Sequence, residues 1–425
     1  MMRINTPNTL YTNASACDRK RAYEALAGGS SSGRTIDSDS VYRGSNPRPP
    51  ATPSARLGFM NIPTKTTHYD VLDGLRGIAA FAVMFCHFLK PTDTQLFPNA
   101  GLAVDFFFIL SGFVIMHAYG KRLRGGMPTR EYLCRRVIRL YPLFLIGLII
   151  GTPVLIWLTQ TGFSTYSYSQ IAASLPVNIA FLPFPTHEGV FNLGVSRKTF
   201  GEIFPSNPPA WSLFFEMIAS FAFVFLLKLK RRALIGGIVF CYGLLLLGKG
   251  ELGGSMSAYF WSGFPRVMFG FMLGNLIYLL STDTKYTEKL QVFVKRYVRF
   301  SYVPYVLLIG IFAMSLPAYA ITAYQMMVIA LLAPILVAAA SKIKPKGTEQ
   351  RIAKTLGWLS YPVYCLHFPV GRAVFLAGKD SGLSQMALMT IASLLTIAVA
   401  VVLTKFIEEP ARRLLSKKIL PKMIR

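Results

Sequence analysis

Long runs of apolar residues, separated by shorter polar stretches, occupy most of the chain from residue 70 onwards. About 20 apolar residues in a helix suffice to cross the hydrocarbon core of a bilayer, and most of the runs reach that length. The fifth and seventh runs are shorter. The pattern predicts an all-α, polytopic membrane protein with about ten transmembrane helices. The runs lie approximately at residues 71–89, 102–119, 141–158, 211–228, 233–248, 262–280, 301–316, 320–340, 355–376 and 386–407.

Lysine and arginine are concentrated in every second connection between these runs. Residues 120–140 alone contain seven of them, whereas the connection at 317–319 contains none. Basic residues accumulate in the cytoplasmic loops of membrane proteins. The alternation therefore predicts an even number of spans, with both termini in the cytoplasm. The basic connections are 120–140, 228–232, 283–299 and 342–354, and further basic residues follow the last run.

Two stretches do not fit a simple alternation of spans and short loops. Residues 159–210 form a long, proline-rich and mildly apolar connection on the outer side. A loop of that length is uncommon without a role, so we expect it to dip into the membrane interface or to cover a cavity. Residues 1–59 have a composition typical of disorder, and Met60 is an alternative start. We predict a disordered tail at 1–59, a membrane domain at 60–413 and a basic cytoplasmic tail at 414–425.

The overall composition agrees with a membrane protein, because 53% of the 425 residues are hydrophobic and only 15% are charged. The formal net charge is +26. These basic residues are divided among separate loops, which argues against a nucleic-acid partner. The five cysteines lack the spacing of metal ligands, and three of them lie inside apolar runs. We therefore expect neither a metal site nor a disulfide framework.

The first apolar run, residues 70–89, contains the chemically most informative side chains. Arg76 and His87 are eleven residues apart, which is almost three helical turns, so they share a face about 16 Å apart along the axis. Asp73 lies close enough to pair with Arg76. A charge at membrane depth costs roughly 2.5 to 3.5 kcal/mol, so we expect these groups to line a cavity. The alternative is a buried structural histidine and an arginine that reaches the membrane surface.

Six short motifs follow one another along residues 69–413. They begin with YDVLDGLRGIAAFAVMFCHF, GLAVDFFFILSGFVI and REYLCRRVIRLYP, and continue with NPPAWSLFFEM, SYPVYCLHFP and EEPARR. In this order and spacing, the motifs resemble those of the integral-membrane acyltransferase family 3. Six collinear motifs are far more specific than any one of them.

The resemblance implies a multi-pass enzyme of the bacterial inner membrane. Such enzymes transfer an acyl group, most often acetyl, from cytoplasmic acyl-CoA to a hydroxyl of an exopolysaccharide, an O-antigen or another surface glycan. Acyl-CoA is then a co-substrate, with no tightly bound cofactor. The expected partners are acyl-CoA, a glycan or lipid-linked sugar acceptor, the lipid bilayer and polysaccharide-assembly proteins. A rival interpretation is a transporter or flippase of a lipid-linked sugar or small solute, but the sequence shows no inverted repeat.

His87 matches the family's catalytic histidine. Transfer to a hydroxyl requires a base, and imidazole titrates near neutral pH. An acyl-imidazole intermediate is a second interpretation that the sequence leaves open. Glu216 is the candidate that orients the imidazole, as the third member of a triad does. Its alternative role is a salt bridge to Arg266, which also lies at an outer helix end.

The family resemblance and the chemistry of CoA suggest a set of arginines for the donor. The planar guanidinium fork of Arg76 suits phosphate oxygens. Arg135, Arg136 and Arg139 close the basic connection on the same side, and the last two are one turn apart. These three also fit a role in topology or in contact with anionic lipid.

The remaining candidates form a weaker set of substrate-binding residues. Each also has a structural interpretation: Ser111 permits close helix packing, Trp211 anchors the chain at the membrane interface, and His367 is a hydrogen-bonded core histidine. The set consists of Asp105, Ser111, Trp211, Arg266, Tyr364 and His367.

Overall fold

The computed structural model describes residues 68–89, 96–191, 198–248, 250, 252–298 and 300–424. All of them belong to the second of two units into which the chain divides, Thr66–Arg425. The tail expected at 1–59 and the alternative start at Met60 lie outside the described residues.

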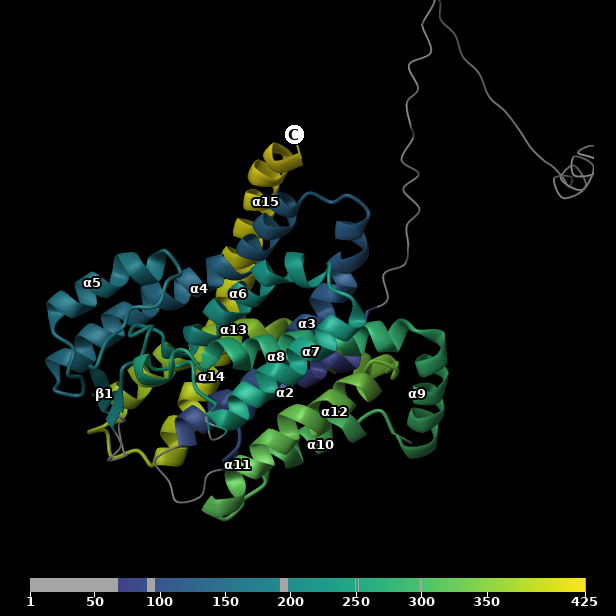
Figure 1. The fold of residues 1–425 in the computed structure, drawn as a ribbon. Coiled ribbons are helices and arrows are strands. Elements are labelled where there is room, and N and C mark those ends of the chain that lie inside the picture. The colour runs from purple at the N-terminus through teal and green to yellow at the C-terminus, as the bar shows by residue number, and fades with distance from the viewer. Residues whose placement is uncertain are drawn as a thin grey trace, which may run out of the picture. The chain divides into compact units, whose positions relative to one another are not determined.

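Each of the ten predicted apolar runs coincides with helical structure (Figure 1). The helices are α2 (Asp70–Leu89), α3 (Leu102–Arg124), α4 (Thr129–Gln160), α6 (Trp211–Leu226), α7 (Arg231–Leu247), α8 (Gly263–Thr282), α10 (Val303–Ala313), α11 (Ala318–Met327) with α12 (Ala333–Ala340), α13 (Gly347–Gly378) and α14 (Gln385–Leu403).

Within the described part of the chain, seven helical stretches are long and apolar enough to cross a membrane, and α10 is a shorter apolar helix. The structure thus confirms an all-α, polytopic membrane protein. The count of ten spans and the cytoplasmic placement of both termini stay predictions.

Shorter elements complete the fold. Helix α5 (Tyr168–Ile179) lies in the long outer connection, and α9 (Thr284–Tyr297) precedes α10. In the described part of the chain, the remaining elements are two π-helical turns, two 3₁₀ turns, one antiparallel strand pair and the last helix. The π-helical turns are η3 (Val328–Leu332) and η4 (Thr404–Glu408), and the 3₁₀ turns are η1 (Pro208–Ala210) and η2 (Ser257–Tyr259). The strands are β1 (Gly189–Phe191) and β2 (Lys198–Phe200), and the last helix is α15 (Glu409–Ile424). Helix α15 runs on from α14 through η4, so the predicted boundary at residue 413 falls inside a helix.

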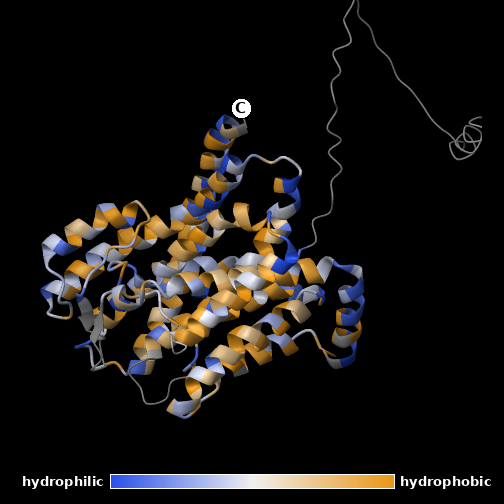
Figure 2. Ribbon diagram, viewed as in Figure 1, coloured by the Kyte–Doolittle hydropathy of each residue, from blue (hydrophilic) through white to orange (hydrophobic). Residues whose placement is uncertain are grey.

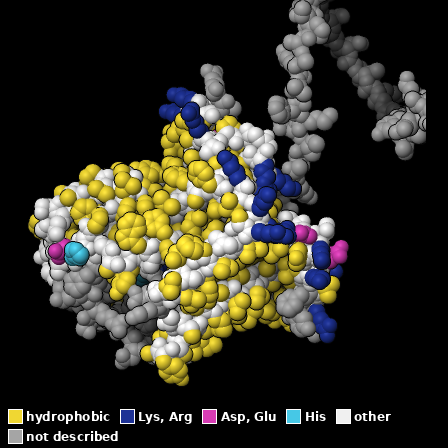
Figure 3. Space-filling model, viewed as in Figure 1, with side chains coloured by type: hydrophobic (Ala, Val, Ile, Leu, Met, Phe, Trp, Pro, Cys, Tyr) yellow, Lys and Arg dark blue, Asp and Glu magenta, His cyan; other side chains and the backbone are white. Residues whose placement is uncertain are grey.

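Polar and apolar side chains are separated along the molecule. Hydrophobic residues dominate the central helices (Figure 2). Figure 3 shows lysine and arginine gathered over α9, α15 and the connection between α3 and α4. These are connections that the alternation of basic loops assigns to the cytoplasm.

Helix α2 packs along α13 through small residues. A Cβ atom added at Gly77 would lie 2.5 Å from Leu356, and one added at Gly371 would lie 2.1 Å from Phe88. Glycine therefore permits the close approach of the two backbones. Because both sequence numbers increase together along the contact, α2 and α13 run parallel. In the predicted topology, α2 is the first span and α13 is the ninth. Two odd-numbered spans cross the membrane in the same direction, so they must also run parallel.

Helices α3 and α8 make a second close contact. The Cβ of an alanine at Gly112 would lie 2.0 Å from the carbonyl oxygen of Phe271, and one at Gly274 would lie 2.0 Å from that of Ile109. At each of these two glycines, the backbone of one helix is in direct contact with the backbone of the other. This contact confirms the close-packing interpretation of the Ser111–Gly112 pair.

Part of the connection at residues 159–210 packs into the helix bundle, whereas its predicted position at the membrane interface or over a cavity stays a prediction. Its helix α5 is attached to α4, where the Tyr141 hydroxyl donates to the Ile179 carbonyl at 2.8 Å. The following segment inserts between α4 and α13, because Asn207 Nδ2 donates to the Cys365 carbonyl at 2.9 Å. A Cβ atom at Gly151 would lie 1.9 Å from the Ser206 carbonyl oxygen.

Replacing Gly112 by alanine tests the α3–α8 contact. The added methyl group meets the Phe271 backbone, so we expect Gly112→Ala to destabilise the protein by about 1–3 kcal/mol, as overpacking does. The measurement is the melting temperature of the detergent-solubilised protein, determined by size-exclusion chromatography of samples heated to increasing temperatures. The control is Gly236→Ala in α7, where no atom lies within 4 Å of the added Cβ. Equal melting temperatures for the two variants would contradict the observed packing.

Candidate functional site

Both polar side chains that the sequence places on one face of α2 contact α13. Arg76 Nε donates to Ser360 Oγ at 2.9 Å, and Nη2 donates to the Gly357 carbonyl at 2.9 Å. The same Nη2 lies 3.0 Å from Asp73 Oδ1, which confirms the expected pair. Further along α2, His87 Nδ1 lies 2.9 Å from His367 Nε2. The shared face is therefore as predicted, and its partner is α13.

The two histidines form a compact pair between α2 and α13. Their ring centroids are 5.1 Å apart, and the Phe368 ring stands edge-on to His87 at 5.2 Å. The His367 side chain is fully buried, and its Nδ1 lies 3.0 Å from the Val363 carbonyl oxygen. Among the described residues, no three histidine, cysteine or acidic side chains are placed to hold a metal ion.

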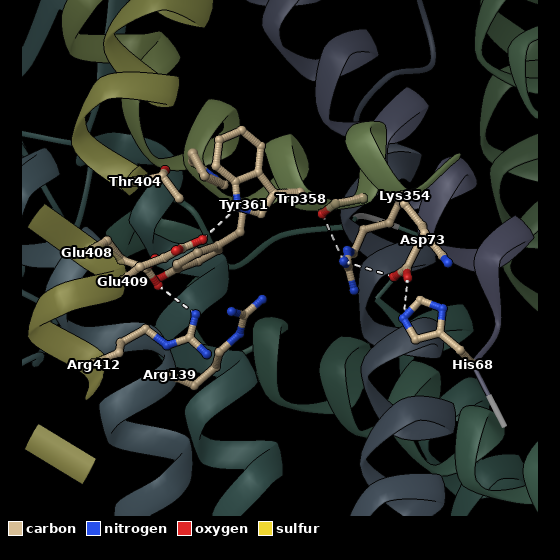
Figure 4. A pocket seen from close by; sticks show the side chains of 13 residues that line it. His68, Asp73, Arg139, Lys354, Trp358, Tyr361, Thr404, Glu408, Glu409 and Arg412 are labelled. Atoms are coloured by element: carbon tan, nitrogen blue, oxygen red, sulfur yellow. Dashed lines mark hydrogen bonds and ion pairs between the residues drawn. The ribbon is translucent and has the colours of Figure 1, made fainter. Parts of the chain in front are cut away.

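A cavity of about 530 Å³, which we term the polar cavity, opens beside Arg76. Helices α2, α4, α13 and α15 and the π-helical turn η4 supply its walls. Figure 4 shows Arg139 beside Arg412 on one side, with Asp73, His68 and Lys354 on the other. The cavity therefore brings together charged side chains from four separate parts of the chain.

A second cavity of about 190 Å³, which we term the deep cavity, adjoins the polar cavity. Asp73, Arg76, Arg139 and Tyr361 line both. The deep cavity has a largely apolar lining, to which Leu72, Phe107, Leu110, Val114 and Ile115 contribute. His87 is not among the lining residues of either cavity.

Arg139 differs from its neighbours in how its charge is compensated. Arg76 pairs with Asp73, and Arg412 pairs with Glu408 at 2.9 Å. In the described part of the chain, no carboxylate lies within ion-pair distance of Arg139, whose guanidinium stands 5.8 Å from the centroid of the Tyr361 ring. A cation of this kind at the junction of the two cavities favours an anionic ligand.

The structure corrects the expectation for Glu216. Its Oε1 accepts hydrogen bonds from Arg136 Nη2 at 2.8 Å and from Ser111 Oγ at 3.0 Å. Glu216 projects from α6 toward α3 and α4, whereas His87 faces α13. The prediction that Glu216 contacts His87 is thus wrong, because Glu216 forms an ion pair with Arg136. The alternative prediction of a salt bridge to Arg266 is also wrong, because Arg266 pairs with Asp105. Both Glu216 and Arg136 line the deep cavity.

Arg135 points elsewhere than the other arginines of its motif. Its Nε donates to Glu131 Oε1 at 2.8 Å, one turn earlier on α4. Neither cavity includes Arg135 among its lining residues. Of the three loop arginines predicted for the donor, the structure thus brings Arg136 and Arg139 to a cavity.

Three of the weaker candidates form a buried cross-link near the N-terminal end of α3. The guanidinium of Arg266 binds both carboxylate oxygens of Asp105, at 2.8 and 2.7 Å, and both side chains are 5% exposed. Trp211 covers this pair, with its ring centroid 5.2 Å from the guanidinium carbon. Because Trp211 is only 8% exposed, its interpretation as an interface anchor is wrong. The cross-link joins α3, α6 and α8 and leaves these side chains in a structural role.

Tyr364 connects the deep cavity to the histidine pair. It lines the deep cavity, and its hydroxyl lies 2.6 Å from Ser212 Oγ. On the same helix, the Tyr364 and His367 ring centroids are 6.0 Å apart. The histidine pair therefore lies about one helical turn beyond the inner wall of the deep cavity.

Several lining residues were not singled out from the sequence. Lys354, Trp358 and Tyr361 recur at helical spacing on one face of α13, a signal that indicates a common surface but not what that surface contacts. Arg412 belongs to the EEPARR motif, whose position in the fold the sequence does not reveal.

Comparison with known proteins identifies the family of this chain. The family model of acyltransferase family 3, an acyltransferase domain, matches residues 69–405. "Protein 2 in picA locus" of Rhizobium radiobacter is 34% identical over 165 residues, which cover 36% of this chain and 78% of that protein. "Acyltransferase MdmB" of Streptomyces mycarofaciens is 26% identical over 191 residues, 42% of this chain and 44% of that protein. No solved structure matches the chain. The chain therefore belongs to acyltransferase family 3 and is a multi-pass membrane acyltransferase.

Proposed function

We propose that this acyltransferase moves an acyl group, acetyl in the first instance, from cytoplasmic acyl-CoA to a hydroxyl of a cell-surface glycan. The acceptor is an exopolysaccharide, an O-antigen or a related lipid-linked sugar, and the enzyme acts in the bacterial inner membrane. The observation that carries the proposal is the pair of adjoining cavities, which share Arg76 and Arg139 as lining residues, with Tyr364 of the deep cavity beside the histidine pair.

The polar cavity supplies the chemistry that the phosphate end of acyl-CoA requires. Arg76, Arg139, Lys354 and Arg412 line it, and guanidinium groups bind phosphate oxygens through paired hydrogen bonds. The basic connections of the predicted topology place this end of the bundle on the cytoplasmic side, where acyl-CoA is available. The cavity thus suits a polyanionic donor that arrives from the cytoplasm.

The deep cavity suits the uncharged arm of the donor. Its mainly apolar lining accommodates a chain without formal charge, and it leads from Arg76 toward Tyr364. Such a chain would carry the thioester from the phosphate-binding end into the membrane domain. His367 and His87 lie just beyond, so the reacting groups meet near the inner wall.

His87 is the base of the proposed reaction. It removes the proton of the acceptor hydroxyl while the oxygen attacks the thioester carbonyl, and the C–S bond then breaks. The leaving thiolate takes up the proton that His87 has accepted, so the products are an ester and CoA. The glycan acceptor rests on the resemblance to the family, whose membership also argues against the transporter interpretation.

Removing Arg139 tests donor binding. Because its charge lacks a carboxylate partner among the described residues, Arg139→Ala takes away a phosphate contact without exposing an acidic group. One charge-assisted hydrogen bond contributes about 1.5–3 kcal/mol, so we expect binding of acetyl-CoA to weaken about 10- to 100-fold. The measurement is the Kd of radiolabelled acetyl-CoA with the detergent-solubilised protein.

The matched control is Arg231→Ala, which removes an arginine paired with Asp283 outside both cavities. That variant should retain the affinity of the unmodified protein. If Arg139→Ala binds acetyl-CoA as tightly as the control does, the polar cavity is not the donor site.

Replacing His87 tests the chemical step. We expect His87→Gln to lower acyl transfer by at least about 100-fold, because general base catalysis contributes 10²–10⁴ in rate. Binding of acetyl-CoA should be unchanged. The measurement follows radiolabel from acetyl-CoA into the glycan fraction of membranes. His117→Gln is the control, since His117 faces Tyr278 of α8 rather than the histidine pair. Normal label transfer in His87→Gln would remove this imidazole from the mechanism.

A further inference from the structure

We propose that His367 is the positioning residue of the active site and that it holds His87 in the tautomer whose Nε2 carries the lone pair. The catalytic consequence rests on the proposed function, whereas the hydrogen-bond pattern stands on the geometry alone. In this arrangement a second imidazole takes the place that a carboxylate occupies in a catalytic triad.

The direction of the first hydrogen bond is set by chemistry. His367 Nδ1 lies 3.0 Å from the Val363 carbonyl oxygen. A carbonyl oxygen only accepts hydrogen bonds, so the hydrogen atom is on His367 Nδ1. The side chain is fully buried among helices of a membrane domain, where an added charge is costly. His367 is therefore a neutral Nδ1–H imidazole.

The direction of the second hydrogen bond follows from the first. A neutral imidazole with its hydrogen on Nδ1 has its lone pair on Nε2. His367 Nε2 can then only accept, and the atom 2.9 Å away is His87 Nδ1. His87 Nδ1 is the donor, which leaves the lone pair of the neutral His87 ring on Nε2. Two hydrogen bonds thus determine which nitrogen of His87 is basic.

Aromatic side chains restrain both rings in this geometry. Phe368 stands edge-on to His87, and the rings of Phe88 and Tyr364 lie 6.4 and 6.0 Å from that of His367. The nearest positive charge on α13 is Arg372, whose guanidinium lies 4.0 Å above the Phe368 ring. Close packing of this kind limits the rotation that would exchange the two nitrogens of His87.

The pair supports proton transfer in both directions. When His87 Nε2 accepts the hydroxyl proton, the ring becomes an imidazolium, and its Nδ1–H donates a charge-assisted hydrogen bond to His367. Proton transfer to the leaving thiolate restores the neutral ring. A neutral partner avoids placing a permanent carboxylate at this depth, where ionised side chains are costly. Glu216, the carboxylate expected from the sequence, pairs with Arg136 instead.

The tautomers can be measured without reference to activity. The chain contains five histidines, so ¹⁵N-histidine labelling of the full-length protein in lipid nanodiscs gives few ring signals. Comparison with His87→Gln and His367→Gln assigns the two signals of interest. We expect both rings to carry hydrogen on Nδ1 above neutral pH. A wild-type His87 with its hydrogen on Nε2 would overturn the proposal, whether or not the protein acylates a glycan.

Two substitutions of His367 distinguish a role in positioning His87 from a role in helix packing. Leucine at position 367 has no acceptor, so we expect His367→Leu to lower kcat about 100-fold or more, with KM for acetyl-CoA within about 2-fold of wild type. Glutamine can offer its amide oxygen where Nε2 was, so His367→Gln should recover kcat to within about 10-fold of wild type.

Melting temperatures of both variants identify any general loss of folding. Equal kcat values in the two folded variants would overturn the positioning role. A residue that acts through packing alone would be replaced equally well by leucine, which has no hydrogen-bond acceptor, and by glutamine, which has one. Absence of acyl transfer to any glycan in the wild-type protein would instead contradict the proposed function and leave the tautomer measurement valid.

Discussion

The parallel packing of α2 against α13 is the constraint on which the rest of the site depends. Glycines at 77, 357 and 371 let the two backbones approach closely enough for polar groups to meet across the interface. Arg76 binds Ser360 and the Gly357 carbonyl, while His87 binds His367. In a membrane domain, unsatisfied polar groups are costly, so each of these contacts also fixes the register of the two helices.

Charge is distributed along this interface in a definite order. Arginine and carboxylate side chains line the polar cavity near the basic connections, whereas the neutral histidines lie deeper, beyond Tyr364. The buried ion pair Asp105–Arg266 and the partly buried pair Glu216–Arg136 connect other helices. Because these carboxylates are paired with arginine, a second imidazole is the group that meets His87. In the proposed function, this order puts anion recognition at one end of the site and proton transfer at the other.

Much of this arrangement was predictable from local patterns. The apolar runs indicated every main helix, and the eleven-residue separation of Arg76 and His87 placed them on one face. The length of the connection at residues 159–210 indicates a segment with a role of its own, and the structure adds that its Asn207 is hydrogen-bonded to α13. Other predictions were wrong because they required a choice of partner for a side chain. The sequence favours His87 as the partner of Glu216 and the membrane interface as the position of Trp211, because it gives no measure of how a helix is rotated toward neighbours that are remote in the chain.

Periodicity, motif order and the alternation of basic loops therefore suffice for helix positions, membrane class and family, because each can be read along the chain without knowledge of how the helices pack. The identity of each polar partner is a property of the tertiary structure alone. It depends on the rotation, depth and direction of helices that are remote in the chain, as with α2 and α13. The adjoining cavities and the hydrogen-bonded histidine pair exist only once those helices are packed.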